Sequence, residues 1–260
     1  MKQNKALVFL NVLWMLSILL FFTGCPQSTG SGGSPNSPVS DRAGIIVLKD
    51  GTFVEPADYT AFDAENPPLA ILIGTKDKNG KAIAIALHSG TSKYWAKTGT
   101  TGYTTKFDSI VCTPSATGPG TAATATFTGD TDGSDNWSEI CNTEPAGTAN
   151  AAENYPAFHW VNTYNTSYAA VLAGATPAWY MPSLAELCDV YKNKDAINAS
   201  LAKIKGLNSA AADSSLKNWY WASSQNDFHE TLVWSVAFSN AAVETAGKAN
   251  PLSVCCLAAF

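Results

Sequence analysis

The stretch Trp234-Ser235-Val236-Ala237-Phe238-Ser239 alternates large apolar residues with small ones. Successive side chains of a β-strand point to opposite faces, so this period of two predicts a strand. One face would carry the large residues Trp234, Val236 and Phe238. The other face would carry the small residues Ser235, Ala237 and Ser239. Because each aromatic ring can bury roughly 150–250 Å², we expect the first face to be core and the second to be exposed.

The segment just before this strand has no regular period. Residues 226–232, Asn-Asp-Phe-His-Glu-Thr-Leu, mix acidic, aromatic, basic and apolar side chains, and they follow Trp219-Tyr220-Trp221. Irregular loops held by a regular scaffold often carry binding residues. We therefore predict a binding surface here, and the alternative is an ordinary strand preceded by a surface loop.

The composition is that of a globular protein. The 260 residues are 46% hydrophobic and 14% charged, with a formal net charge of -5. A chain of this length can bury a proper core, and one large domain is the natural expectation. An acidic chain without a basic run is a poor nucleic-acid binder, so we expect no nucleic-acid partner.

The amino-terminal segment has the pattern of a targeting signal. Lys2 and Lys5 precede the apolar residues 6–22, and a small-residue stretch then ends at Cys25. This pattern resembles a bacterial lipoprotein signal, with residues 1–24 as the signal peptide and Cys25 as the lipidated residue. The resemblance implies a multiply acylated protein anchored in a membrane, at the cell surface or facing the periplasm. The alternatives are a plain signal peptide or an uncleaved anchor.

Residues 25–42 join Cys25 to the rest of the chain. The segment is rich in Pro, Gly and Ser and has no apolar period, which is typical of a flexible tether. We expect a single domain over 43–260, with its binding region in 219–260.

The first part of that domain reads as strands. An Asp50-Gly51 turn between apolar runs predicts a β-hairpin over 45–54. Residues 69–74 and 82–87 are apolar enough to be central strands. Residues 88–120 read as loop with one short strand, and 121–128 as a further strand.

The second part reads as helices followed by strands. Tyr155, Phe158, Val161 and Tyr164 have helical spacing, with Pro156 in the first turn. Ser183 and Glu186 form a capping box before a helix, and a second helical piece continues to Gly206. Strands resume after residue 218. The order of strands, helices and strands predicts an α+β fold with an antiparallel sheet.

Five cysteines follow Cys25, and an exported protein can form disulfides. We predict a Cys112–Cys141 pair, because both residues lie in loop-rich sequence. Cys188 with Cys255 or Cys256 is a second predicted pair. The vicinal Cys255-Cys256 could alternatively be a redox site.

Three acidic residues near the middle of the chain form a candidate calcium site: Asp130, Asp132 and Asp135. Hard oxygen ligands at this spacing suit Ca²⁺, although no glutamate follows at EF-hand distance. The alternative is a series of turns, which Asp-Gly-Ser clusters commonly form. Otherwise we expect no cofactor.

No catalytic constellation is evident in the sequence. The three histidines are scattered, no phosphate loop occurs, and no carboxylate pair is placed for acid–base work. We therefore do not predict an enzyme.

Four motifs together resemble one family. Trp179-Tyr180-Met181-Pro182-Ser183-Leu184-Ala185-Glu186-Leu187 resembles the "WYLPS..EL" helix entry of a C-type-lectin-like domain, in the branch related to the formylglycine-generating enzyme. Residues 220–225, YWASSQ, resemble its "YWSSSQ". The residues from Val233 to Lys248 resemble its "AW.V.F..G.V....K", and 254–260 a degraded terminal motif. The resemblance implies a C-type-lectin-like fold with a mixed or antiparallel sheet, two main helices and an irregular, loop-rich middle.

Departures from the motifs cluster near the carboxyl end. This is similar to the variable proteins of treponemal diversity-generating retroelements, which are lipid-anchored and vary a carboxyl-terminal binding surface. The resemblance implies a diversified, non-catalytic receptor or adhesin for an external protein or glycan. We expect these contact residues: Ala222, Asn226, Asp227, Phe228, His229, Thr231, Ser235, Ala237 and Ser239. Residues assigned to the framework are Trp219, Trp221, Trp234 and Phe238.

Two other functions are kept as alternatives. One is a calcium-stabilised glycan-binding adhesin that uses the three aspartates and is not diversified. The other is an oxidase-like enzyme of the formylglycine-generating type. That enzyme uses a pair of copper-binding active-site cysteines, and the motifs do not align this pair with Cys255-Cys256. A shared fold alone does not imply a shared activity.

Overall fold

The computed structural model describes residues 38–260. The predicted signal peptide (1–24), the lipidation site Cys25 and most of the predicted tether lie outside the described residues. A short 3₁₀ turn, η1 (Val39–Asp41), precedes the first strand. That strand begins at Ala43, where the sequence predicts that the domain begins.

The first sheet has the strand order β12-β4-β3-β1-β2, and its neighbouring strands are antiparallel. Its members are β1 (Ala43–Leu48), β2 (Phe53–Val54), β3 (Pro68–Lys76), β4 (Ala82–Ala86) and β12 (Leu257–Ala259). The predicted Asp-Gly hairpin is confirmed: Gly51 N–H donates to the Leu48 carbonyl at 3.0 Å, and Gly51 has a φ of 85° that favours glycine. The two predicted central strands are also confirmed.

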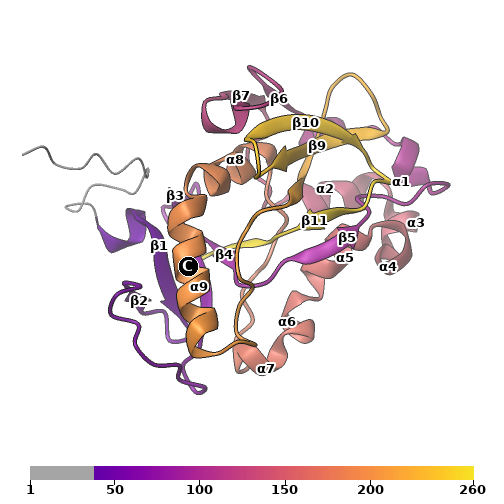
Figure 1. The fold of residues 1–260 in the computed structure, drawn as a ribbon. Coiled ribbons are helices and arrows are strands. Elements are labelled where there is room, and N and C mark those ends of the chain that lie inside the picture. Colours follow the sequence, from indigo (N-terminus) through magenta and orange to yellow (C-terminus); the bar gives the residue numbers. More distant parts are fainter. Residues whose placement is uncertain (1–37) are drawn as a thin grey trace, which may run out of the picture.

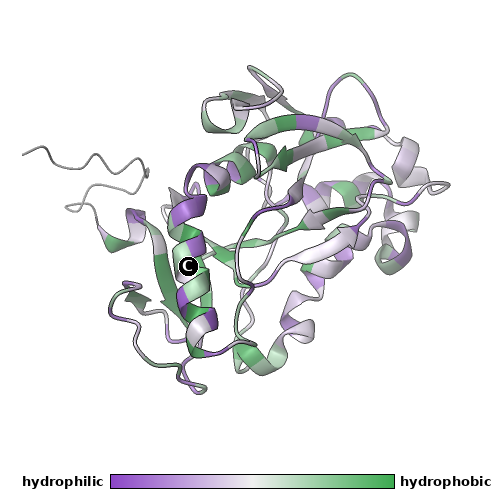
Figure 2. Cartoon of the chain, viewed as in Figure 1, coloured by the Kyte–Doolittle hydropathy of each residue, from purple (hydrophilic) through white to green (hydrophobic). Residues whose placement is uncertain are grey.

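Both faces of this sheet are buried. Alternate residues of β3 enter different core clusters: Ile71 belongs to one and Leu72 to the other. The helix α9 (Lys194–Leu207) covers the Ile71 face, which Figure 1 shows as the long helix in front of β1 and β3. Burial on both faces explains why these strands read as continuous apolar runs, which are green in Figure 2.

The second sheet has the strand order β10-β9-β8-β11-β5. Its members are β5 (Gly90–Lys93), β8 (Trp219–Gln225), β9 (Leu232–Ala237), β10 (Ala242–Gly247) and β11 (Leu252–Val254). The β11–β8 pair is parallel and the others are antiparallel, so the sheet is mixed. The last two strands of the chain join different sheets, and Cys255 and Cys256 form the link between them.

A small hairpin packs beside the second sheet, as Figure 1 shows near β10. It consists of β6 (Cys112–Pro114) and β7 (Phe127–Gly129). The segment that joins these strands pairs with β10 through Gly118 and Val243. It also contains the 3₁₀ turn η3 (Thr121–Ala123), so the strand predicted for 121–128 is confirmed only at its carboxyl end.

Helices fill the middle of the chain and cover the sheets. They are α1 (Thr101–Thr104), α2 (Asn136–Thr143), α3 (Pro145–Thr148), α4 (Ala151–Asn154), α5 (Pro156–Asn162), α6 (Tyr164–Ser167), α7 (Ala169–Leu172), α8 (Leu184–Lys192) and α9, with the 3₁₀ turn η2 (Asp108–Ile110). The predicted capping box of α8 is confirmed. Glu186 N–H donates to Ser183 Oγ at 3.3 Å, and Ser183 N–H donates to Glu186 Oε2 at 2.9 Å.

The helix predicted near Tyr155 exists as a chain of short helices rather than one long one. Pro156 is the first residue of α5, as predicted, since proline lacks the N–H that a first turn leaves unpaired. Tyr155, Phe158, Val161 and Tyr164 are all buried in the second core cluster. The arrangement of sheets and helices confirms the α+β class. Within residues 38–260, no helix has the length and apolar character needed to cross a bilayer.

Candidate ligand-binding surface

A buried asparagine organises the loop between β8 and β9. We call residues 226–231 the Asn226 loop. Asn226 is fully buried, and its Oδ1 accepts hydrogen bonds from Phe228 N–H at 3.0 Å and His229 N–H at 2.7 Å. Its Nδ2 donates to the carbonyls of His229 and Leu232. Asparagine favours such turns because its short amide can bond to the backbone two residues away. Asn226 therefore shapes the loop from within and is not itself a contact residue.

Phe228 projects from this loop. Its side chain is 65% exposed, although it is a large apolar group. Its ring lies edge-to-face against Trp234, with 6.2 Å between the ring centroids and 84° between the planes. Trp234 is held in turn by a 2.6 Å hydrogen bond from its Nε1 to the Cys112 carbonyl. An exposed aromatic ring on a fixed support is a typical binding feature.

A cavity of about 390 Å³ lies beside Phe228. We call it the edge pocket, and its lining residues are Thr117, Gly118, Phe228, Trp234, Glu244 and Thr245. Three separate parts of the chain form it: the segment after β6, the Asn226 loop with β9, and strand β10. Among the described residues that line the edge pocket, Glu244 is the charged one, and its charge is negative.

The prediction that the small residues of β9 point outward is wrong for Ser235 and Ala237. Both are fully buried. In the strand register, Ser235 faces Trp221 and Ala237 faces Trp219 on β8. Directly opposite residues place their Cβ atoms only about 5 Å apart, so a small side chain beside each indole is required by packing. Ser235 Oγ also donates to the Glu244 carbonyl at 3.1 Å. These positions belong to the scaffold.

Ala222 is also fully buried, within β8, so its predicted exposure is wrong as well. Its carbonyl accepts a hydrogen bond from Trp95 Nε1 at 3.1 Å. The predicted framework residues Trp221, Trp234 and Phe238 are buried, which agrees with that role, while Trp219 is half-buried.

The other predicted contact residues are accessible. Asp227 and His229 are exposed, and Thr231 is half-buried with its Oγ1 3.0 Å from His229 Nδ1. The Asn226 loop thus brings these three together with Phe228. Ser239 is exposed but follows β9, at the opposite end of that strand from the loop.

The sequence did not indicate the residues of the edge pocket outside the Asn226 loop and β9. Thr117 and Gly118 lie in a loop of low complexity, and their position depends on a pairing with β10. Gly118 N–H donates to the Val243 carbonyl at 2.8 Å. Predicting this contact would have required knowing that these two distant segments pair, and the sequence alone does not show this.

The three aspartates predicted for calcium form turns. Asp130 Oδ1 accepts from Asp132 N–H at 3.1 Å, and Asp132 Oδ1 accepts from Ser134 N–H at 3.0 Å. Asp132 Oδ2 lies 3.3 Å from Lys78 Nζ, and Asp135 directly precedes α2. Within residues 38–260, no group of three or more histidine, cysteine or acidic side chains is placed to hold a metal ion.

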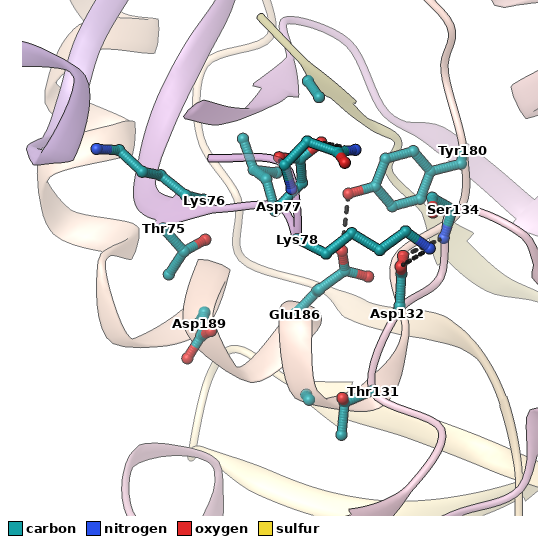
Figure 3. Close-up of a pocket in the computed structure, with 14 residues that line it drawn as sticks. Thr75, Lys76, Asp77, Lys78, Thr131, Asp132, Ser134, Tyr180, Glu186 and Asp189 are labelled. Carbon is teal, nitrogen blue, oxygen red and sulfur yellow. Dashed lines mark hydrogen bonds and ion pairs between the residues drawn. The ribbon is translucent and has the colours of Figure 1, made fainter. Parts of the chain in front are cut away.

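Asp132 also lines a larger cavity of about 440 Å³ at the start of α8. Figure 3 shows the Tyr180–Glu186 hydrogen bond and the Lys78–Asp132 ion pair as dashed lines among the residues that line this cavity. Tyr180 Oη donates to Glu186 Oε1 at 2.7 Å, and Gly133 N–H donates to Glu186 Oε2 at 2.9 Å. Burial raises the pKa of Glu186 despite these donors. Both carboxylate oxygens of Glu186 therefore already accept hydrogen bonds, one of them from the Ser183 N–H of the capping box.

All five cysteines in the described part of the chain are free. The predicted Cys112–Cys141 and Cys188–Cys255 or Cys188–Cys256 pairs are therefore wrong for this structure. Four of the thiols are core groups, and burial raises the pKa of Cys112, Cys188 and Cys255 to about 12. Neither Cys255 nor Cys256 reaches the surface as a redox site would require.

Comparisons with known proteins give a fold relationship. No protein-family model matches this chain, and no curated protein matches it. Among solved structures, a fimbrial protein from Bacteroides ovatus ATCC 8483 superposes with a TM-score of 0.55 at 14% sequence identity. The match covers 84% of this chain and 49% of the fimbrial protein, so this chain spans about half of that protein's length. At this identity the similarity shows a shared fold alone.

Proposed function

We propose that the protein is a membrane-anchored, ligand-binding lipoprotein with a C-type-lectin-like domain. In this proposal Cys25 carries the lipid and the domain recognises an external ligand without catalysis. The Asn226 loop and the edge pocket form the contact surface. The observation that carries the proposal is the 65% exposure of Phe228 on a loop fixed by a buried asparagine.

This geometry favours binding because the aromatic group is already held in place. An exposed ring that is ordered before binding loses little conformational entropy when a ligand covers it. Aromatic groups next to a pocket commonly supply most of the binding energy of an interface. Asp227, His229 and Thr231 surround Phe228 with polar groups that would select among ligands.

The C-type-lectin-like assignment rests on the motifs and on how they meet. The segment that contains Pro182 and Ser183 contacts the YWASSQ segment directly. Ser223 N–H donates to the Pro182 carbonyl at 2.7 Å, and Leu184 N–H donates to Ser224 Oγ at 2.9 Å. Matched motifs that form one packed unit support the family resemblance more strongly than scattered matches would.

The external role has two supports. The amino-terminal pattern around Cys25 resembles a lipoprotein signal. The structural similarity to a fimbrial protein agrees with an adhesin-like role. Metabolic labelling with a palmitate analogue tests the anchor: label should enter the wild-type protein and be lost in Cys25→Ala.

We extend the proposal to diversification of the exposed positions only. Asp227, Phe228, His229, Thr231 and Ser239 are accessible, whereas Ser235 and Ala237 are fixed by the neighbouring tryptophans. A near-copy of the 3′ coding segment that differs mainly at adenines, beside a reverse-transcriptase gene, would support this. Substitutions in such copies should spare the codons of the buried positions.

The central experiment removes the surface and preserves the scaffold. Asp227, Phe228, His229 and Thr231 are replaced together by alanine, and both proteins are screened against a glycan array and a displayed peptide library. Binding should disappear while the melting temperature stays within a few degrees. Ser239→Ala is the control, since Ser239 is exposed in the turn after β9, at the opposite end of that strand from the loop. Retained binding in the fourfold variant would refute the proposed surface.

A further inference from the structure

The outer edge of β10 is only partly covered. In the β10–β9 register, Val243 faces Val236 and Thr245 faces Trp234. The Val243 carbonyl accepts from Gly118 N–H at 2.8 Å, and Val243 N–H donates to Thr121 Oγ1 at 3.2 Å. Both backbone groups of Val243 therefore point away from β9. Backbone groups of a strand repeat their direction every second residue, so those of Thr245 point to the same edge.

The chain covers the first half of this edge and leaves the second half open. Gly118, Gly120 and Ala122 donate to the carbonyls of Val243, Asn240 and Ala241. Within residues 38–260, no segment pairs with β10 beyond Val243 on this side. The edge pocket begins there, and Thr245 is one of its lining residues. An unpaired strand edge beside a cavity is a site for adding another strand.

We propose that the ligand of this surface is an extended polypeptide segment that adds to β10 at Thr245. This inference rests on the proposed function and names its ligand class. The Thr245 N–H and C=O would bond to the peptide backbone. An apolar side chain of the peptide would enter the edge pocket, because Thr245 and its cross-strand neighbour Trp234 share a face and Phe228 packs on Trp234.

Charge favours a basic peptide. Glu244 lines the edge pocket, and Asp227 and Glu230 are exposed on the adjoining Asn226 loop. Opposite charges across an interface steer the encounter and fix the register. The peptide should therefore carry an apolar residue that faces Phe228, with lysine or arginine residues next to it in the sequence.

The test begins with a phage library of linear random peptides, selected on the full chain. Selected sequences should combine apolar and basic residues, and a synthetic copy should bind the wild type in fluorescence anisotropy. Thr245→Pro removes the edge N–H, and proline is tolerated on edge strands. This variant should weaken peptide binding at least tenfold with little change in melting temperature. Equal affinity in a folded Thr245→Pro would overturn the proposal.

A second measurement does not depend on that variant folding. The selected peptide is N-methylated at one residue at a time. Strand addition requires every second peptide N–H, so affinity should fall at alternate positions and stay unchanged between them. Loss without a period of two would overturn the proposal, because a ligand held by side chains alone shows no such alternation.

The outcomes separate this inference from the proposed function. A glycan bound by the wild type, lost with Phe228→Ala and retained with Thr245→Pro, would support the surface and overturn the peptide as its ligand. Self-association that Thr245→Pro abolishes, without any selected peptide, would instead make a second copy of this chain the occupant and also overturn it. Peptide binding unaffected by Phe228→Ala would refute the proposed surface itself.

Discussion

The Lys248 ammonium group lies 4.9 Å from the centroid of the Trp95 ring, inside the core. The same group lies 5.0 Å from the Phe107 ring and donates hydrogen bonds to the carbonyls of Gly102 at 2.9 Å and Thr105 at 2.7 Å. Lys248 is completely buried. It joins the end of β10 to the loop around α1, and through Trp95 it reaches the carbonyl of Ala222.

This buried lysine predicts a rise in stability with pH. Burial lowers the pKa of Lys248 to about 7, although the Glu230 carboxylate opposes the shift. In the unfolded chain a lysine titrates near 10.4, so above pH 7 the unfolded state holds a proton that the folded state has released. The free energy of unfolding then increases with pH. The neutral amine keeps two N–H groups, enough for both carbonyls.

The measurement compares wild type with Lys248→Met by urea denaturation between pH 7 and 8.5. The difference in unfolding free energy should grow in favour of wild type by about 1–2 kcal/mol, since one pH unit corresponds to about 1.36 kcal/mol per proton. The buried thiols of Cys112, Cys188 and Cys255, whose pKa values burial raises to about 12, lower the stability of both proteins above about pH 8.5, and their contribution cancels in this difference. A difference independent of pH would contradict the shift.

Asn226 should matter for stability more than its place in a surface loop suggests. Its side chain makes hydrogen bonds with backbone groups of Phe228, His229 and Leu232. Each is worth about 1 kcal/mol net, so Asn226→Ala should lower the free energy of unfolding by about 2–4 kcal/mol. Amide hydrogen exchange in the Asn226 loop should accelerate. Asp227→Ala, at the exposed neighbouring position, should leave both quantities nearly unchanged.

Local signals in the sequence predicted much of the fold. The capping box at Ser183 and Glu186 specifies a helix start through two backbone hydrogen bonds between near neighbours. The Asp50-Gly51 turn works similarly, because only a few residues adopt its geometry. Such features depend on residues a few positions apart, and they can therefore be recognised without a structure.

The proposed binding surface was harder to predict because it depends on contacts between segments that are distant in the sequence. The period of two correctly placed Trp234 and Phe238 in the core, but it could not show what lies on the other face. Ser235 is buried because Trp221 stands opposite on β8, and that register is set by the whole sheet. The edge pocket likewise requires Gly118 to reach Val243. The sequence could single out the Asn226 loop as a candidate because its residues are contiguous.

Calcium should change the stability of the described domain little. The Oδ1 atoms of Asp130 and Asp132 accept backbone hydrogen bonds, and Lys78 forms an ion pair with Asp132 Oδ2. A cation that bound these Oδ1 atoms and Asp132 Oδ2 would have to displace these contacts. We expect the melting temperature in millimolar CaCl₂ to match that in EDTA within about 1 °C. An increase of several degrees that is lost in Asp130→Asn would show a site that forms only with the ion.

The last prediction separates variable from fixed positions on β9 and its following turn. Ser235→Tyr would insert a ring where Trp221 lies directly across, and overpacking of a filled core costs about 1–3 kcal/mol or more. The buried hydroxyl's bond to the Glu244 carbonyl would also be lost. Ser239→Tyr places the same ring on an exposed position, where substitutions usually change stability by less than about 0.5 kcal/mol. Urea denaturation of both variants provides the comparison. A Ser235→Tyr protein as stable as Ser239→Tyr would mean that β9 does present its small residues outward.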